Sequence, residues 1–142
     1  MSRIGSKDTK PEIIVRSLLH RMGYRFRLHR KDLPGNPDIL LPKLRIALFV
    51  NGCYWHGHEP CHLFRLPKTR TEFWAKKIRK NRERDCLNYL ALQKLGWKTV
   101  VVWECAVSKR RRLTEIDLAQ SLFKAVCSQK TFLEIHGKCD AG

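Results

Sequence analysis

The chain has 142 residues, a length typical of one domain built around one hydrophobic core. It contains 29 lysine and arginine residues against 13 aspartate and glutamate residues, for a formal net charge of +16. Such a charge favours polyanionic partners, among them DNA, RNA and anionic membrane surfaces. No apolar run approaches the roughly 20 residues of a membrane helix, and the N-terminus lacks a signal-peptide core. We therefore exclude an integral membrane protein and expect a cytoplasmic location.

The first predicted element is a helix that begins near residue 10. Asp8 or Thr9 can cap its free amide groups, and Pro11 suits its first turn. Apolar residues then recur at helical spacing as far as Met22, and Gly23 is typical of a helix end.

Three strands are predicted after this helix. The segment 24–29 alternates aromatic and basic side chains, as in a half-exposed strand. A turn rich in proline and glycine at 33–37 precedes a short strand at 38–41. The segment 45–50 is a stronger strand with apolar residues on both faces, which predicts a central position in a sheet.

A long helix is predicted from about residue 72 to residue 95. Thr71 is its expected cap, and Gly96 its expected end. Apolar residues recur along it near helical spacing, which predicts one buried face. The side chains expected on that face are Phe73, Trp74, Ile78, Leu87, Leu90 and Ala91.

The last part of the chain contains a predicted strand and a predicted helix. The strand covers 97–103, and Thr114 caps a helix that ends near residue 126. We expect 128–142 to be loosely ordered, so that the core of a single domain covers about 7–127. The order of elements predicts an α/β fold with a mixed β-sheet flanked by helices.

The segment 51–64 is rich in glycine, histidine and cysteine and has no hydrophobic period. Cys53, His58 and Cys61 lie close together in it, and Cys105 follows the strand predicted downstream. Structural zinc sites use four cysteine and histidine ligands in a tetrahedron, and a metal can organise a loop that lacks an apolar core. The pattern indicates a zinc site, while scattered thiols beside exposed histidines are the alternative.

Two large aromatic residues, Tyr54 and Trp55, lie in the same loop. They can pack beneath the loop as a small apolar cluster, or they can stack on or wedge between nucleic-acid bases. The excess of positive charge favours the second interpretation.

Three residues are candidates for phosphodiester hydrolysis. Asp38 stands at the start of a strand, where with Glu12 it can hold Mg2+ while a substrate phosphate completes the coordination. His56 can serve as a general base. The alternative for Asp38 is a solvated cap at the end of a turn.

The chain closely resembles the very-short-patch-repair (Vsr) endonucleases over about residues 7 to 106. The matching segments keep their order and spacing, so the resemblance is specific. They are Lys7-Asp8-Thr9-x-x-Glu12, Leu33-Pro34-Gly35-Asn36-Pro37-Asp38, Phe49-Val50-Asn51-Gly52-Cys53-Tyr54-Trp55-His56-Gly57-His58, Pro67-x-Thr69-Arg70-Thr71-Glu72-Phe73-Trp74, Lys77-Ile78-x-Lys80-Asn81-x-Glu83-Arg84-Asp85, Leu95-Gly96-Trp97 and Val102-Trp103-Glu104-Cys105.

The resemblance implies a restriction-endonuclease-like fold and a Mg2+-dependent enzyme. Such an enzyme nicks DNA on the 5′ side of the mismatched T in a T·G pair and so initiates very short patch repair. By resemblance, Asp38 is the central Mg2+ ligand together with the backbone carbonyl of Val50. Glu12 reaches the metal through water, and His56 is the general base or positions the water.

Two further sets of residues follow from the resemblance. The structural Zn2+ ligands are Cys53, His58, Cys61 and Cys105. The aromatic wedge that opens the base stack beside the mismatch consists of Tyr54, Trp55 and Trp74. A mismatched step is already weakly stacked, so it opens at lower cost than a paired step.

The chain departs from the family pattern at three places. Asn51 stands near the metal where the best-known member has a histidine, and an asparagine is not a proton donor of the same kind. One extra residue separates His58 from Cys61. Few residues precede Lys7, whereas the family clamps DNA with an N-terminal arm.

Family resemblance also implies partners: double-stranded DNA with a T·G mismatch, a mismatch-repair linker protein and a cytosine methyltransferase. We expect a nucleoid-associated monomer. Two other functions stay open at this point. The chain could be a homing or phage-type nicking endonuclease with another target, or a non-catalytic zinc module that binds nucleic acid.

Overall fold

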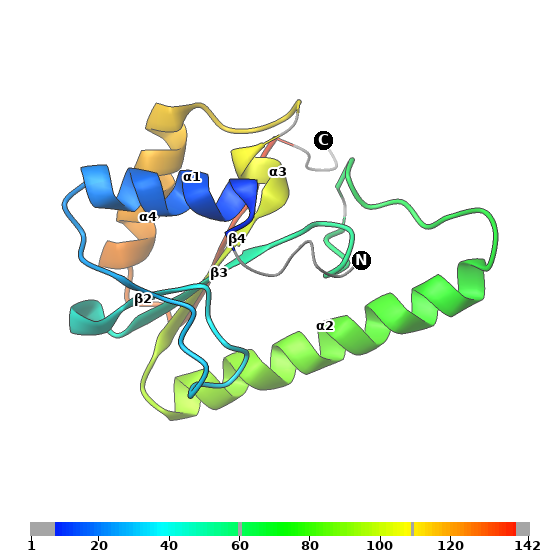
Figure 1. The fold of residues 1–142 in the computed structure, drawn as a ribbon, viewed down its shortest axis with the longest axis horizontal. Helices are drawn as coiled ribbons and strands as arrows, with labels where there is room; N and C mark the ends of the chain where they lie inside the picture. The colour runs from blue at the N-terminus through cyan, green and yellow to red at the C-terminus, as the bar shows by residue number, and fades with distance from the viewer. Residues whose placement is uncertain (1–7, 60, 109, 139–142) are drawn as a thin grey trace.

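The computed structural model describes residues 8–59, 61–108 and 110–138 (Figure 1). The elements in chain order are α1 (Lys10–Arg21), β1 (Arg27–Leu28), β2 (Ile39–Leu41), the 3-10 turn η1 (Pro42–Leu44), β3 (Ile46–Asn51), α2 (Thr71–Lys94), β4 (Lys98–Trp103), α3 (Glu104–Val107), α4 (Glu115–Cys127) and β5 (Phe132–Ile135). The N-terminal arm and Lys7 lie outside the described residues. No helix in the described part of the chain is long and apolar enough to cross a membrane.

The strands form one mixed sheet in the order β1-β2-β3-β4-β5. The pairs β1–β2 and β2–β3 are antiparallel, whereas β3–β4 and β4–β5 are parallel. The central strand β3 is almost entirely buried, as the apolar residues of 45–50 predict. This arrangement confirms the predicted mixed sheet.

Helices cover both faces of the sheet: α1 and α4 lie over one face, and α2 runs along the other (Figure 1). Alternate strand residues therefore enter two separate cores. Leu48 and Val100 belong to the core beneath α1 and α4. Phe49 and Val101 belong to the core that contains Leu92 of α2.

Helix α1 begins as predicted. The Thr9 side chain, rather than that of Asp8, is the cap and accepts a hydrogen bond from the Glu12 N–H at 3.3 Å. The following strand is shorter than the predicted 24–29, because β1 contains only Arg27 and Leu28, both exposed.

The predicted buried face of the long helix is confirmed at Ile78 and wrong at Phe73, Leu87 and Leu90. Phe73, Leu87 and Leu90 are exposed, Leu87 to 67%, and only Ile78 and Leu92 are buried. Figure 1 shows that the N-terminal half of α2 extends past the sheet, which accounts for the exposure of Phe73. Leu87 and Leu90 belong to the turns beside the sheet, but the residues of these turns that enter the core are Tyr89 and Leu92.

The start of α2 also differs from the prediction. Its N-cap is Arg70, in the left-handed conformation, with no side-chain cap. The hydroxyl of Thr71 instead donates backwards to the carbonyl oxygen of Pro67 at 2.7 Å. Thr71 therefore fastens the preceding loop to the helix.

The segment after Ser128 is not loosely ordered throughout, so that prediction is wrong for residues 132–135. These residues form β5, which pairs in parallel with β4 and buries Ile135. A strand this short carries too little periodicity to be recognised in the sequence. The last residues, 139–142, lie outside the described part.

Candidate active site and metal centre

A cleft of about 1170 Å³ lies between the start of α1, the start of β2, the end of β3 and the middle of α2. The structure brings seven of the predicted site residues to its wall. They are Glu12, Asp38, Val50, Asn51, Tyr54, Trp55 and His56. The volume of the cleft is large enough to admit a phosphodiester group.

The Asp38 carboxylate lies immediately before β2 and is held by the neighbouring strand. The Val50 N–H donates to its Oδ2 at 2.8 Å. Burial is the main reason why the pKa of Asp38 rises from 3.8 to about 6. The hydrogen bond from Val50 opposes this rise, the Glu12 carboxylate adds to it, and His29 and His56 oppose it.

The backbone of Val50 also contributes to the site. A residue in a strand directs its N–H and C=O toward the same neighbour. Because the N–H of Val50 reaches Asp38, its carbonyl oxygen faces the same side. A carboxylate and a backbone carbonyl are the oxygen ligands that Mg2+ accepts in proteins, so this pair fits a divalent cation.

Glu12 is a buried carboxylate whose side chain is only 2% exposed. Its Oε2 lies 2.7 Å from His29 Nε2 and 3.2 Å from Arg16, which also donates to Asp8 at 2.8 Å. The contacts with His29 and Arg16 both involve Oε2, and Glu12 lines the cleft. Sequence reasoning missed His29 because a single histidine beside a short strand has no distinctive pattern.

His56 is paired with a carboxylate from α2. Its Nδ1 lies 2.6 Å from Oδ2 of Asp85, and both side chains are partly buried at the cleft. A carboxylate at Nδ1 orients an imidazole and leaves Nε2 as the nitrogen that can exchange a proton with substrate or water. The contact spans 29 positions of the chain, so spacing could not reveal Asp85.

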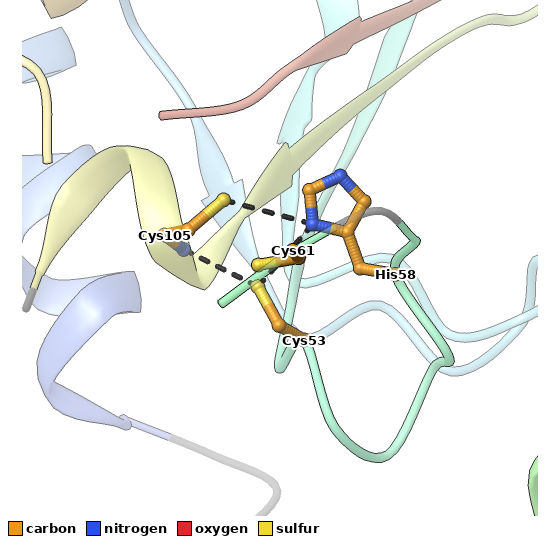
Figure 2. A group of neighbouring side chains, drawn as sticks. All are labelled: Cys53, His58, Cys61 and Cys105. Carbon is orange, nitrogen blue, oxygen red and sulfur yellow. Dashed lines mark hydrogen bonds between the residues drawn. The ribbon is translucent and has the colours of Figure 1, made fainter. Parts of the chain in front are cut away.

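The four predicted zinc ligands meet beside the cleft (Figure 2). Cys53 lies just after β3, and Cys105 lies just after β4. The two strands are parallel neighbours, so their C-terminal ends lie side by side. The Nδ1 of His58 lies 3.5 Å from the Cys53 sulfur and 3.6 Å from the Cys105 sulfur. With Cys61, all four ligand atoms fall within 4.8 Å of one another.

Backbone N–H groups surround the sulfur atoms. Cys105 N–H donates to Cys53 Sγ at 3.4 Å, Leu63 N–H to Cys61 Sγ at 3.4 Å, and Gly137 N–H to Cys105 Sγ at 3.3 Å. Such donors stabilise thiolates and orient metal ligands. A Cys3His set of this kind can hold a tetrahedral metal ion such as Zn2+.

The imidazole of His58 is suited to bind a metal. It stacks on Trp103 with ring centroids 4.2 Å apart and an interplanar angle of 5°. Burial, and secondarily the charge of His136, lowers the pKa of His58 from 6.5 to about 4. The ring is therefore neutral near pH 7, and only a neutral imidazole is a ligand.

The aromatic residues of the loop meet the start of α2. The ring centroids of Tyr54 and Trp55 are 5.1 Å apart, and those of Trp55 and Trp74 are 6.0 Å apart. Trp55 is 50% exposed, so it is not packed beneath the loop. Two rings that were not predicted to belong to the aromatic wedge extend this group. The Phe73 ring lies 5.1 Å from that of Trp74, and the Phe64 ring lies 6.1 Å from that of Tyr54.

A cleft that holds the buried Glu12, the partly buried Asp38 and a carboxylate-bound histidine, in an α/β protein of net charge +16, is typical of nucleases. Residues 1–62 match the family model for the DNA mismatch endonuclease Vsr. The chain belongs to the Vsr family of DNA endonucleases, which has a restriction-endonuclease-like fold.

Relatives of the chain have related activities in their names. The DNA mismatch endonuclease Vsr of Escherichia coli is 42% identical over 135 residues, covering 95% of this chain and 86% of the relative. The type II nicking enzyme V.XorIIP of Xanthomonas oryzae is 56% identical over 108 residues, covering 76% and 79%. The type II nicking enzyme V.NmeAIP of Neisseria meningitidis is 46% identical over 110 residues, covering 78% of each chain. This protein is accordingly a DNA nicking endonuclease.

Proposed function

We propose that this enzyme nicks one strand of duplex DNA on the 5′ side of the mismatched T in a T·G pair, with Mg2+ as its cofactor, and so initiates very short patch repair. The observation that carries the proposal is one cleft, in which Asp38, Glu12 and His56 lie beside the exposed Trp55. Cutting and sensing of a weakly stacked step would thus share one site.

Asp38, the Val50 carbonyl and, through water, Glu12 are the residues that would hold Mg2+. When bound, the cation neutralises negative charge on the scissile phosphate. His56, oriented by Asp85, accepts a proton from the attacking water through Nε2. The water oxygen forms a bond to phosphorus, the bond from phosphorus to the leaving oxygen breaks, and that oxygen takes up a proton from solvent.

The aromatic group would provide the selectivity for mispaired DNA. Insertion of Trp55, with Tyr54 and Trp74 behind it, unstacks a base step at a cost of a few kcal/mol. A T·G step is less well stacked than a paired step, so the cost is smaller there. Selectivity then arises from deformation energy as well as from contacts to base edges.

Zn2+ is the proposed occupant of the Cys3His cluster, with a structural role. Trp55 and His56 lie between the ligands Cys53 and His58, so a metal at this position would fix the segment that carries them. Metal binding energy would replace the apolar core that this loop lacks. Binding and chemistry would then rest on one rigid support.

A different target is the alternative that the relatives favour, since several are named type II nicking enzymes. A non-catalytic zinc module would have no use for the buried acids and the His56–Asp85 pair. A panel of matched and mismatched duplexes distinguishes an enzyme with a different target from a mismatch-repair enzyme. Equal nicking of paired and mispaired DNA contradicts the repair function.

The test is strand-resolved cleavage of a labelled T·G duplex beside its T·A control. We expect a nick in the T strand of the T·G duplex with Mg2+, and no nick with EDTA. Asp38→Ala should abolish nicking and leave DNA binding largely intact. The matched control is Asp32→Ala, because Asp32 is exposed and paired with Arg30 outside the cleft. Normal cutting by Asp38→Ala would show that the metal assignment is wrong.

The other family expectations are part of the same proposal. We propose a single-domain, monomeric enzyme that acts on the bacterial nucleoid in the cytoplasm. A mismatch-repair linker protein and a cytosine methyltransferase are its proposed protein partners. Support for these points comes from the family membership alone.

A further inference from the structure

The hydroxyl of Tyr89 lies at the cleft, on α2, and has no role in the function proposed above. Its ring is fixed in the core between two other rings. The centroid distances are 5.2 Å to Phe49, in an edge-on contact, and 5.4 Å to Phe132. The phenol can therefore place its hydroxyl in the cleft without ordering a flexible side chain when substrate binds.

Asn51 determines the direction of the hydrogen bond at this hydroxyl. The Nδ2 of Asn51 lies 2.9 Å from the Tyr89 oxygen. An amide NH2 group can only donate, so the phenolic oxygen is the acceptor. The phenolic proton stays available, and the structure gives it no acceptor among the described residues. Asn51 is only 5% exposed, so the pair is held in place.

The surroundings of Tyr89 favour a phosphate as the acceptor of this proton. Glu12, Asp38 and Asp85 supply acceptors to the cleft, whereas a phosphate that is being cut needs donors. Burial, and secondarily the Asp85 carboxylate, raises the pKa of Tyr89 above its ordinary value. The phenol therefore keeps its proton at neutral pH.

We propose that Tyr89 is a catalytic residue whose hydroxyl donates to a non-bridging oxygen of the scissile phosphate, and that Asn51 is the positioning residue that directs this proton into the cleft. The inference rests on the proposed function. It assigns Asn51 a role different from that of a histidine at the same position, because its amide acts through Tyr89.

The first test is Tyr89→Phe, which removes the hydroxyl and keeps the ring. The single-turnover nicking rate on a T·G duplex should fall about 100-fold, the effect typical of losing one preorganised donor. The dissociation constant for the same duplex, measured by anisotropy in EDTA, should stay unchanged. The matched control is Tyr24→Phe, since Tyr24 does not line the cleft; it should nick at the wild-type rate.

The second test reverses the hydrogen bond without touching the tyrosine. The Asn51→Asp side chain can only accept, so it should take the phenolic proton and lower the nicking rate as Tyr89→Phe does. Adding Tyr89→Phe to Asn51→Asp should then cause no further loss, because both changes remove the same donor. A purely structural tyrosine would show additive losses instead.

The outcomes separate this inference from the function on which it rests. Wild-type nicking of the T·G duplex together with unimpaired nicking by Tyr89→Phe overturns the role of Tyr89 and leaves the proposed function standing. A parallel loss of Tm, DNA affinity and rate in Tyr89→Phe also overturns it, because that result indicates a packing role. Absence of nicking by the wild-type enzyme on every duplex refutes both.

Discussion

The carboxyl group of Asp38 is partly buried, and that burial has an energetic cost. A buried carboxylate favours its protonated form, as the raised pKa of about 6 indicates. At neutral pH the folded, metal-free protein must keep this group charged. The charged Asp38 carboxylate therefore lowers the free energy of unfolding of the metal-free protein, although the same charge favours cation binding.

Asp38→Asn should stabilise the metal-free protein at high pH. Since the folded pKa of about 6 exceeds the ordinary 3.8, the carboxyl group costs nothing below pH 3.8 and its full penalty appears above about pH 6. The variant should be more stable by about 3 kcal/mol at pH 8, and the difference should vanish near pH 3.5. Urea unfolding at both pH values measures this.

Magnesium provides the control for that measurement. It should stabilise the wild-type protein at pH 8 and leave Asp38→Asn unaffected, because ligand binding to the folded state adds stability. Equal stability of the two proteins at pH 8 without metal would contradict the assigned burial of the carboxylate.

Single residues divide clearly into those that the sequence can reveal and those that it cannot. Residue types and the family resemblance single out Asp38, Glu12 and His56, and the structure brings all three to one cleft. His29 and Asp85 were not, because each acquires its contact only when distant segments meet. Their partners, Glu12 and His56, are 17 and 29 positions away.

The elements around the Cys3His cluster are connected through one close contact after β5. Gly137 donates its N–H to the sulfur of Cys105. A Cβ at this position would lie 2.2 Å from the carbonyl oxygen of Cys105 and 2.5 Å from that of Arg111. Both are backbone atoms, so no side chain can move aside. The segment after β5 therefore supports Cys105, the proposed metal ligand that follows β4.

Gly137→Ala should loosen the cluster and lower metal retention. The misfit should cost about 1–3 kcal/mol, seen as a lower Tm and as less than the one zinc per chain expected for the wild type. Gly52→Ala is the control, because its Cβ would meet only ordinary contacts at 3.8 Å or more. Cys53→Ser should lose zinc outright. A Gly137→Ala protein with full zinc content and the wild-type Tm would contradict the contact.

Element prediction was sound where apolar residues are buried in a periodic way and failed where burial depends on neighbours. The central strand and the caps at Thr9 and Thr114 follow from local chemistry. The face of α2 does not, since its apolar residues Leu87 and Leu90 are exposed while Tyr89 and Leu92 of the same turns pack into the core. Periodicity indicates a helix face and says nothing about what covers that face.

The molecule as a whole carries 29 basic residues against 13 acidic ones. Many of the basic residues lie on the exposed turns of α2, which extends past the sheet (Figure 1). The exposed basic residues of this part of α2 are Lys76, Lys77, Arg79, Lys80, Arg82 and Arg84. This distribution predicts that phosphate neutralisation, not base reading, supplies most of the affinity.

Binding to any duplex should therefore be strongly dependent on salt. If the enzyme neutralises 6 to 10 phosphates, affinity should fall roughly 10³- to 10⁵-fold between about 50 and 200 mM salt. Anisotropy titrations in EDTA measure the slope for paired and mispaired duplexes. We expect plots of log affinity against log salt concentration to have similar slopes but different intercepts for the two duplexes. The reason is that insertion of the aromatic residues adds selectivity without releasing counterions. A flat dependence would contradict the electrostatic account.

The order of residues in the loop after β3 has one more consequence, for damaged enzyme. Trp55 and His56 stand between two of the proposed metal ligands, Cys53 and His58. Oxidation of the thiolates would strip the ion and release both residues at once. If Trp55 and His56 have the roles proposed above, oxidised enzyme loses mismatch selectivity and cleavage together. It is therefore inactive, and it does not become a nuclease that cuts DNA unselectively.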